Sequence, residues 1–305
     1  MGTPPEPARD TSLRRARNAE RRRARRATTA RPTFAATLRA LDGLAASGAR
    51  VCVHVADLDR GTVVLAGDDF ETLPVAGLGV VPLLLEVAAG FEAGTLDPLE
   101  IVERASADAA ATTGLWQHLK APALPLFDLA VLAAATGDEL AANALLDRVG
   151  LDAVRARLES LGLTRSALLD RLRDVRGPDD APHFALGSAR ELAQLFGALV
   201  NSQAVSPSVS AQVSEWLSLN HDLSLVAAST GLDPFAHEED QHDLLFINKT
   251  GRENGVRAEA GVLAGPRAGL AYALVVCFDD LSVVHRLRAH DAFRALGVEL
   301  MEYVF

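Results

Sequence analysis

The chain has 305 residues, of which 49% are hydrophobic and 23% are charged, which indicates a globular, enzyme-sized protein able to bury a large core. No run approaches about 18 uninterrupted apolar residues, so the sequence predicts no membrane-spanning helix. The formal net charge of −10 divides unevenly, since residues 1–31 hold ten arginines against three acids and carry +7, which leaves −17 on the remainder.

The arginine-rich segment 1–31 is predicted to be a basic, disordered N-terminal arm. It lacks the apolar stretch that follows the positive region of a secretory or twin-arginine signal, so we expect a cytoplasmic protein. A partner of the arm would be acidic, such as nucleic acid, acidic lipid or the acidic body of a partner molecule. Without interleaved aromatic residues or a nucleic-acid-binding signature, a solvated tail with no specific partner is favoured.

After the arm, the pattern predicts a helix and then a hairpin. Over 32–45 the apolar residues recur at helical spacing, and the pattern ends near Gly48. Apolar and other residues alternate over 51–56, and a short β-like run at 62–65 follows a polar turn, which together predict a β-hairpin. The segment 78–93 is apolar on almost every face, which indicates a helix buried at the centre of the protein.

The middle of the chain is predicted to be helical, and its end to return to strands. Gly150 and Gly162 are natural helix stops. The predicted helices are 126–135, 139–149, 151–161 and 189–200, followed by strands 257–263 and 270–278 and a closing helix 281–303. Strands at both ends with helices between them predict an α/β (α+β) fold, in which both chain ends build one sheet and an all-helical lobe is inserted.

The most informative functional feature is one of only two lysines in the chain. Lys249-Thr250-Gly251 comes just after the apolar run 244–247. Serine acyl-transferases of the penicillin-binding and β-lactamase type combine three motifs, Ser-x-x-Lys, Ser-Asp-Asn and Lys-Thr-Gly. The first is excluded, since the residues three positions before Lys120 and Lys249 are Gln117 and Phe246. Only the third motif is complete.

Two further stretches extend this likeness. Residues 143–151 look like the family helix that follows Ser-Asp-Asn, and residues 255–261 look like the family strand that follows Lys-Thr-Gly. On these motifs, the chain from 32 to 305 resembles the class A serine β-lactamase family. The resemblance implies a β-lactamase/transpeptidase-like fold with an antiparallel sheet and flanking helices. Its α/β lobe would comprise about 32–76 and 205–305, and its helical lobe about 77–204.

The resemblance also implies that the catalytic positions are altered. Gly77 stands where the family has its serine, and Val80 where it has the lysine of Ser-x-x-Lys. Gly137-Asp138-Glu139 stands in place of Ser-Asp-Asn, and 163–188 lacks the Glu-x-x-Leu-Asn string that activates the deacylating water in the family. With no oxygen to attack a carbonyl and no adjacent base, β-lactam hydrolysis is not expected.

What the resemblance leaves is an anion site. In the family, the residues matching Lys249 and Thr250 bind the substrate carboxylate, and an ammonium beside a hydroxyl suits that group. Gly251 would allow a close approach of backbone. Asp138 is interpreted as a structural support of its loop. Glu139 is either a general base near Lys249 or, as favoured, a glutamate at a helix start that interacts with the helix dipole.

The sequence therefore predicts a β-lactamase-fold pseudoenzyme that binds a carboxylate-bearing small molecule or a protein partner. The alternative is an active amide or ester hydrolase whose rebuilt centre uses Glu139, Ser224 or a polarised water. His221, Asp222 and Ser224 are close in sequence, but no Gly-x-Ser-x-Gly elbow accompanies them, so they are interpreted as a polar loop.

No metal site and no cofactor are predicted. His237 and His242 flank an acidic run, but they are five residues apart, whereas His-Glu-x-x-His places its histidines four apart on one helix face. Gly77 and its neighbours lack the third glycine and the lysine of a phosphate loop. Cys52 and Cys277 each lie in a β-like apolar run outside any Cys-x-x-Cys pair, so buried free thiols are the default, and a disulfide stays open.

Overall fold

The computed structural model of the chain describes residues 33–106, 111, 113–237, 243–279 and 282–305. Its compact unit comprises Phe34–Phe305. The predicted arm 1–31 lies outside the described residues, so its disorder and its acidic partner stay predictions.

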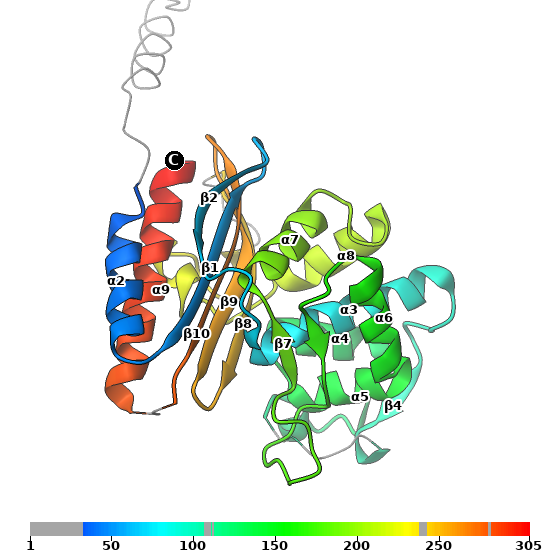
Figure 1. The fold of residues 1–305 in the computed structure, drawn as a ribbon. Coiled ribbons are helices and arrows are strands. Elements are labelled where there is room, and N and C mark those ends of the chain that lie inside the picture. The colour runs from blue at the N-terminus through cyan, green and yellow to red at the C-terminus, as the bar shows by residue number, and fades with distance from the viewer. Residues whose placement is uncertain (1–32, 107–110, 112, 238–242, 280–281) are drawn as a thin grey trace, which may run out of the picture. The chain divides into compact units, whose positions relative to one another are not determined.

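A five-stranded antiparallel sheet forms the centre of this unit (Figure 1). The strand order is β2-β1-β10-β9-β8, with bounds β1 Arg50–Asp57, β2 Thr62–Gly67, β8 Leu245–Glu253, β9 Val256–Ala264 and β10 Gly269–Cys277. β1 pairs along its whole length with β10, so strands from both ends of the domain are neighbours. The predicted sheet built from both chain ends is confirmed.

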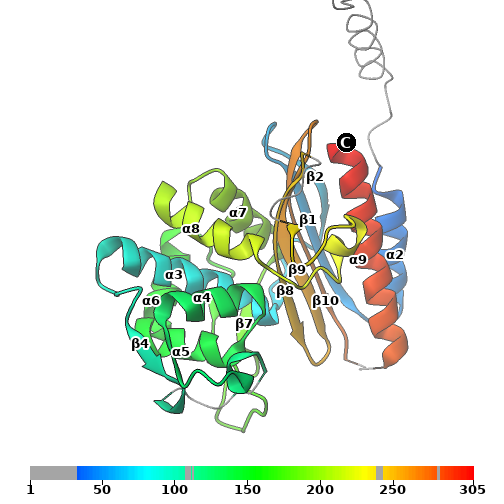
Figure 2. The same ribbon diagram turned by 180° about the vertical axis from the view of Figure 1, so that it is seen from behind.

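Two helices from opposite ends of the domain cover one face of the sheet (Figures 1 and 2). They are α2 (Ala35–Ala46) and α9 (Val283–Val304). α2 has no side-chain cap of its own, because the residue before it, Phe34, has no side-chain acceptor. Glu299 of α9 supplies the missing acceptor: its carboxylate accepts from the N–H groups of Ala36 and Thr37 at 3.0 Å each. This contact fixes the start of α2 on α9, since unpaired N–H groups at a helix start need acceptors.

The other helices lie on the opposite side of the sheet (Figure 2). They are α3 Val80–Ala93, α4 Leu126–Ala135, α5 Glu139–Val149, α6 Leu151–Ser160, α7 Ala189–Val200 and α8 Pro207–Ser218. α3 is central, with ten of its 14 residues buried, in agreement with the predicted core helix. α7 packs on β1, β9 and β10, and α8 packs on α3, α4 and α7 and also on the edge strand β8. The predicted lobe boundaries near 77 and 204 stay a prediction.

Two of these helices, α5 and α7, begin and end where the sequence predicts, and local signals mark where each begins. Asp138 caps α5 by accepting from the N–H of Ala141, and Ser188 caps α7 in the same way through Glu191. Gly150, with a φ of 82°, ends α5. The sequence pattern did not predict α8, although Ser206 caps it and a proline opens its first turn.

Short elements connect these layers. The strands β3 (Leu73–Pro74), β7 (Ala185–Gly187) and β6 (Ala167–Leu168) form a small sheet in the order β3-β7-β6, and β4 (Ile101–Glu103) pairs with β5 (Ala123–Pro125). Single 3-10 turns are η1 (Ala76–Gly79), η2 (Arg104–Ser106), η3 (Trp116–His118) and η4 (Val226–Ser229). The pairing of β3 with β7 fixes the chain just before η1.

One segment of the described residues, Ala76–Ala93, is long and apolar enough to cross a membrane by length and composition, and 67% of it is buried inside the structure. The sequence prediction did not single it out as a span because Glu86 interrupts its apolar run. Leu83, Leu84 and Leu85 are fully buried by protein, so the segment is packed as the core helix of a folded domain.

Cys52 and Cys277 lie on the neighbouring strands β1 and β10 and are both buried free thiols. Burial raises the pKa of Cys52 to about 12 and that of Cys277 to about 11. Because the thiolate is the nucleophilic form, neither sulfur is activated at neutral pH.

Candidate functional site

The predicted site lies where η1 meets β8, the edge strand of the sheet. A Cβ built on Gly77 would lie 3.0 Å from the carbonyl oxygen of Thr250. A Cβ built on Gly251 would lie 2.2 Å from the carbonyl oxygen of Val75. Both glycines therefore allow two backbones to approach closely, and the position that matches the family serine has little room for a side chain.

Lys249 is buried beside this junction, with 3% of its surface exposed. Burial lowers the pKa of its ammonium to about 8, against the opposing effect of Asp222. Gly137 lies nearby, since a Cβ built on it would be 3.7 Å from Lys249 Nζ. Within the described part of the chain, no side chain or carbonyl forms a hydrogen bond or ion pair with this ammonium. The structure thus brings two of the predicted positions to the Lys-Thr-Gly segment: Gly137 lies near Lys249, and Gly77 lies against Thr250 and Gly251.

Thr250 and Arg252 face a carboxylate of the chain itself. The hydroxyl of Thr250 donates to Asp222 Oδ2 at 2.6 Å, and Arg252 Nη2 donates to Asp222 Oδ1 at 2.8 Å. Arg252 also contacts the hydroxyl of Ser224. Burial works to raise the pKa of Asp222, but the hydrogen bond from Thr250 and the charge of Arg252 outweigh it and hold the pKa below its usual value.

A buried polar network supports this loop from below. Glu259 of β9 accepts from the Tyr272 hydroxyl at 2.7 Å, from Asn248 Nδ2 at 2.8 Å and from the N–H of Val226 at 2.7 Å. Burial raises the pKa of Glu259 to about 7, although these hydrogen bonds oppose the rise. Asn248 in turn accepts from Asn220 Nδ2 at 2.7 Å. The network holds the 220–226 loop against the sheet.

The sequence did not single out Arg252 or Glu259 as site residues, and it led to a different interpretation of Asp222. Asp222 was interpreted as part of a polar loop, and Arg252 was not singled out. Arg252 carried a signal, since alternate residues of a strand share a face and it is two positions after Thr250. Glu259 also carried one, as an acid within an otherwise largely apolar strand.

Asp138 is fully occupied by backbone donors. Its Oδ1 accepts from the N–H of Ala141 at 2.9 Å, and its Oδ2 accepts from the N–H of Trp116 at 2.7 Å. Gly114 packs directly on it, because a Cβ there would lie 2.4 Å from the carboxyl carbon. With 1% of its surface exposed, Asp138 holds the start of α5 against the chain around Trp116.

Glu139 is half-buried in the first turn of α5, in an acidic neighbourhood. Burial raises the pKa of its carboxyl to about 7, with further increases from Asp174, Asp138 and Glu253 and an opposing hydrogen bond from Thr113. A carboxyl with this pKa exchanges a proton near neutral pH. Its helix-start position, which the favoured interpretation used, is also observed.

We expect Glu139→Gln to flatten the pH dependence of stability. Because the folded pKa of about 7 lies above the ordinary 4.5, the stability linked to this carboxyl is fully present below pH 4.5 and is lost as pH rises through about 7. At pH 8 the variant should exceed the wild type by at least about 1 kcal/mol, and near pH 4 the two should agree. Urea denaturation across this range measures the difference, and Glu159→Gln on α6 is the matched control. Parallel wild-type and E139Q profiles would contradict the assignment.

Other sequence positions lie outside this junction. Val80, which matches the family lysine, is buried in the hydrophobic core with 3% exposure. The 163–188 segment is tied to α5 by Asn143, whose side chain pairs with both backbone groups of Leu172 at 2.9 Å. His237 is buried and its Nδ1 lies 3.1 Å from the carbonyl of Asp233. His242, the other histidine of this acidic run, lies outside the described residues, so the expectation that no metal is bound there stays untested.

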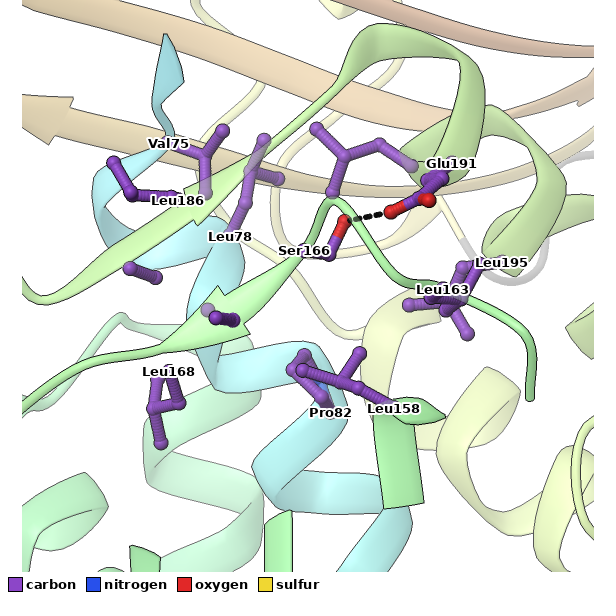
Figure 3. A pocket seen from close by; sticks show the side chains of 14 residues that line it. Val75, Leu78, Pro82, Leu158, Leu163, Ser166, Leu168, Leu186, Glu191 and Leu195 are labelled. Atoms are coloured by element: carbon purple, nitrogen blue, oxygen red, sulfur yellow. Dashed lines mark hydrogen bonds between the residues drawn. The ribbon is translucent and has the colours of Figure 1, made fainter. Parts of the chain in front are cut away.

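A small cavity lies beneath η1 (Figure 3). Its volume of about 20 Å³ holds about one water molecule. Leu78, Pro82 and Leu168 are among its apolar lining residues, and its Ser166 hydroxyl donates to Glu191 at 2.7 Å. Because this polar pair is satisfied and the space is small, the cavity is a packing defect rather than a ligand site.

The comparisons with known proteins agree with this architecture. The chain is similar to a β-lactamase from Sphaerobacter thermophilus, with 21% identity, a TM-score of 0.76, and 88% of this chain and 96% of that chain covered. It is also similar to a β-lactamase from Xanthomonas campestris pv. campestris, with 16% identity, a TM-score of 0.73 and coverage of 90% and 99%. A third structure, PBP-A, gives 19% identity, a TM-score of 0.72 and coverage of 88% and 94%.

These TM-scores establish a shared fold, and they confirm the predicted β-lactamase/transpeptidase-like architecture. No curated protein matches the chain. A model of the Beta-lactamase enzyme family matches residues 33–304, which is nearly all of the described unit. The resemblance drawn from the Lys-Thr-Gly motif and its neighbouring segments is therefore confirmed, and the chain belongs to the Beta-lactamase enzyme family.

Proposed function

We propose that this protein is a non-hydrolytic member of the family that binds a carboxylate-bearing small molecule at Lys249. The observation that carries the proposal is the ammonium of Lys249, a residue with 3% of its surface exposed, which lies near Gly137 and has no hydrogen-bonding partner among the described residues. An unpaired buried charge is costly, so such a group favours an anionic ligand.

The proposal that the protein does not hydrolyse its ligand is supported by the residues at positions 77 and 80. Gly77 offers no oxygen for attack on a carbonyl, and Val80 is an apolar core residue rather than a base. Both buried thiols have raised pKa values, so neither substitutes as a nucleophile. Ligand binding without covalent chemistry is the function that these residues support best.

The test uses benzylpenicillin, because a PBP-A variant forms an acyl-enzyme complex with penicillin G. We expect reversible binding by calorimetry, no mass adduct in intact-mass spectrometry and no loss of penicillin beyond a blank. Lys249→Ala should abolish binding, whereas Lys120→Ala, which removes the exposed and only other lysine, should not.

Binding should also weaken with rising pH. The Lys249 ammonium has a pKa of about 8, so it is charged below that value and neutral above it. One unit above the pKa about a tenth of the ammonium remains charged, and affinity at pH 9 should be about tenfold lower than at pH 7. A pH-independent affinity would show that Lys249 does not provide the charge.

A second function, an amide or ester hydrolase, draws support from Glu139. Its carboxyl has a pKa of about 7, which suits a general base that activates water. This alternative requires turnover of penicillin that Glu139→Gln abolishes while binding persists. A stable acyl adduct would instead identify a nucleophile and would contradict the non-hydrolytic proposal.

A further inference from the structure

The loop 220–226 places a carboxylate of the protein on the donors that a ligand carboxylate would use. Thr250 and Arg252 are alternate residues of β8, and each donates to a different oxygen of Asp222, at 2.6 Å and 2.8 Å. Both oxygens of Asp222 are thus engaged by the Lys-Thr-Gly strand. Each donor therefore binds one oxygen of the same carboxylate, which is how a bound anion is commonly recognised.

This placement is built into the fold. The backbone carbonyl of Asp222 accepts from Asn220 Nδ2 and from Asn248 Nδ2, each at 3.3 Å. Asn248 is itself anchored on the buried Glu259. The loop is therefore attached to β8 by its backbone as well as by the Asp222 side chain, and Asp222 presents its carboxylate in a fixed position.

The carboxylate is also accessible from outside. The side chain of Asp222 is 29% exposed and that of Arg252 is 45% exposed. Lys249, in contrast, is almost fully buried, and no group among the described residues hydrogen-bonds its ammonium. The anion site is consequently divided into an unpaired ammonium and a threonine–arginine pair that already holds an internal carboxylate.

We infer that Asp222 is a specificity-determining residue, an internal carboxylate that competes with ligand carboxylates for Thr250 and Arg252. The inference rests on the proposed function, since it concerns ligands of the same Lys249 site. A ligand carboxylate meets the Lys249 ammonium together with a negative charge, unless it displaces Asp222. The wild-type site therefore binds simple carboxylates weakly and selects ligands whose remaining contacts offset this repulsion.

The experiment compares benzylpenicillin with its uncharged methyl ester on wild type and Asp222→Asn. At pH 6.5, where the Lys249 ammonium is charged, D222N should bind the acid at least about tenfold more tightly than wild type, because two like charges no longer face each other. The methyl ester should bind both proteins equally. Asp152→Asn removes the same charge from a side chain that is 97% exposed, and it should bind like wild type.

The outcomes separate this inference from the proposed function. If D222N binds the acid no more tightly than wild type, while Lys249→Ala abolishes binding, the inference is overturned and the proposed function stands. If neither wild type nor D222N binds the acid, both are overturned. An equal gain for acid and ester would also overturn the inference, because the effect would then be steric rather than electrostatic. Should D222N fail to fold by circular dichroism, Asp222→Ser provides the same comparison.

Discussion

Gly251→Ala should destabilise the protein by about 3 kcal/mol or more, because among the described glycines it would make the shortest contact of an added Cβ. The added Cβ would lie 2.2 Å from the carbonyl oxygen of Val75 and 3.3 Å from the N–H nitrogen of Leu78. Backbone atoms cannot turn away as a flexible side chain can. The variant must therefore push η1 and β8 apart, which opens the junction that contains Gly77 and Lys249.

Thermal unfolding measures this effect, with an expected fall in Tm of about 6 °C or more. Gly43→Ala is the matched control, since Gly43 lies on an exposed face of α2 and a Cβ added there would meet no other atom within 4 Å. That change should leave Tm unchanged or raise it slightly, because alanine is a better helix former than glycine. A Gly251→Ala protein as stable as wild type would show that η1 does not press on β8.

The fold could be predicted from sequence where its signals are local. The bounds of α5 follow from a capping aspartate and a glycine stop, and the buried α3 follows from apolar residues on nearly every face. Strand runs at both chain ends predicted the shared sheet, which the pairing of β1 with β10 confirms. α8 escaped prediction although Ser206 and Pro207 mark its start, because only five of its 12 residues are buried and its apolar pattern is correspondingly sparse.

The site was predictable only in part, because half of it depends on tertiary contacts. Lys249 and Gly77 were found through motif positions, and the structure places them at one junction. Asp222 contacts Thr250 across 28 positions of sequence, and no local pattern indicates that pairing. The raised pKa of Glu139 likewise depends on burial and on Asp174, which approaches from another segment. Local signals identify motif residues, whereas their charge partners are set by loop packing.

Introducing the serine and the lysine that the family has at positions 77 and 80 tests whether these two substitutions are sufficient for acylation. Gly77→Ser alone should cost about 1 kcal/mol, because its Cβ would be 3.0 Å from the Thr250 carbonyl and the backbone must yield by a few tenths of an ångström. Val80→Lys should cost about 3 kcal/mol or more, since it introduces an ammonium into the apolar core. Val80→Met separates charge from volume and should cost less than about 1.5 kcal/mol.

The double variant G77S/V80K should remain unacylated by benzylpenicillin in intact-mass spectrometry, even where circular dichroism shows it folded. Burial lowers the pKa of a lysine, which favours the neutral amine that can act as a base. The surrounding site nevertheless opposes the reaction. Gly137 lacks a hydroxyl for proton relay, Glu139 presents a carboxylate where the family has an amide, and Asp222 already holds the Thr250 hydroxyl. An acyl adduct on the double variant would show that these three features do not block the site. Its absence, with folding intact, would mean that a serine and a lysine at positions 77 and 80 are not sufficient for acylation in this junction.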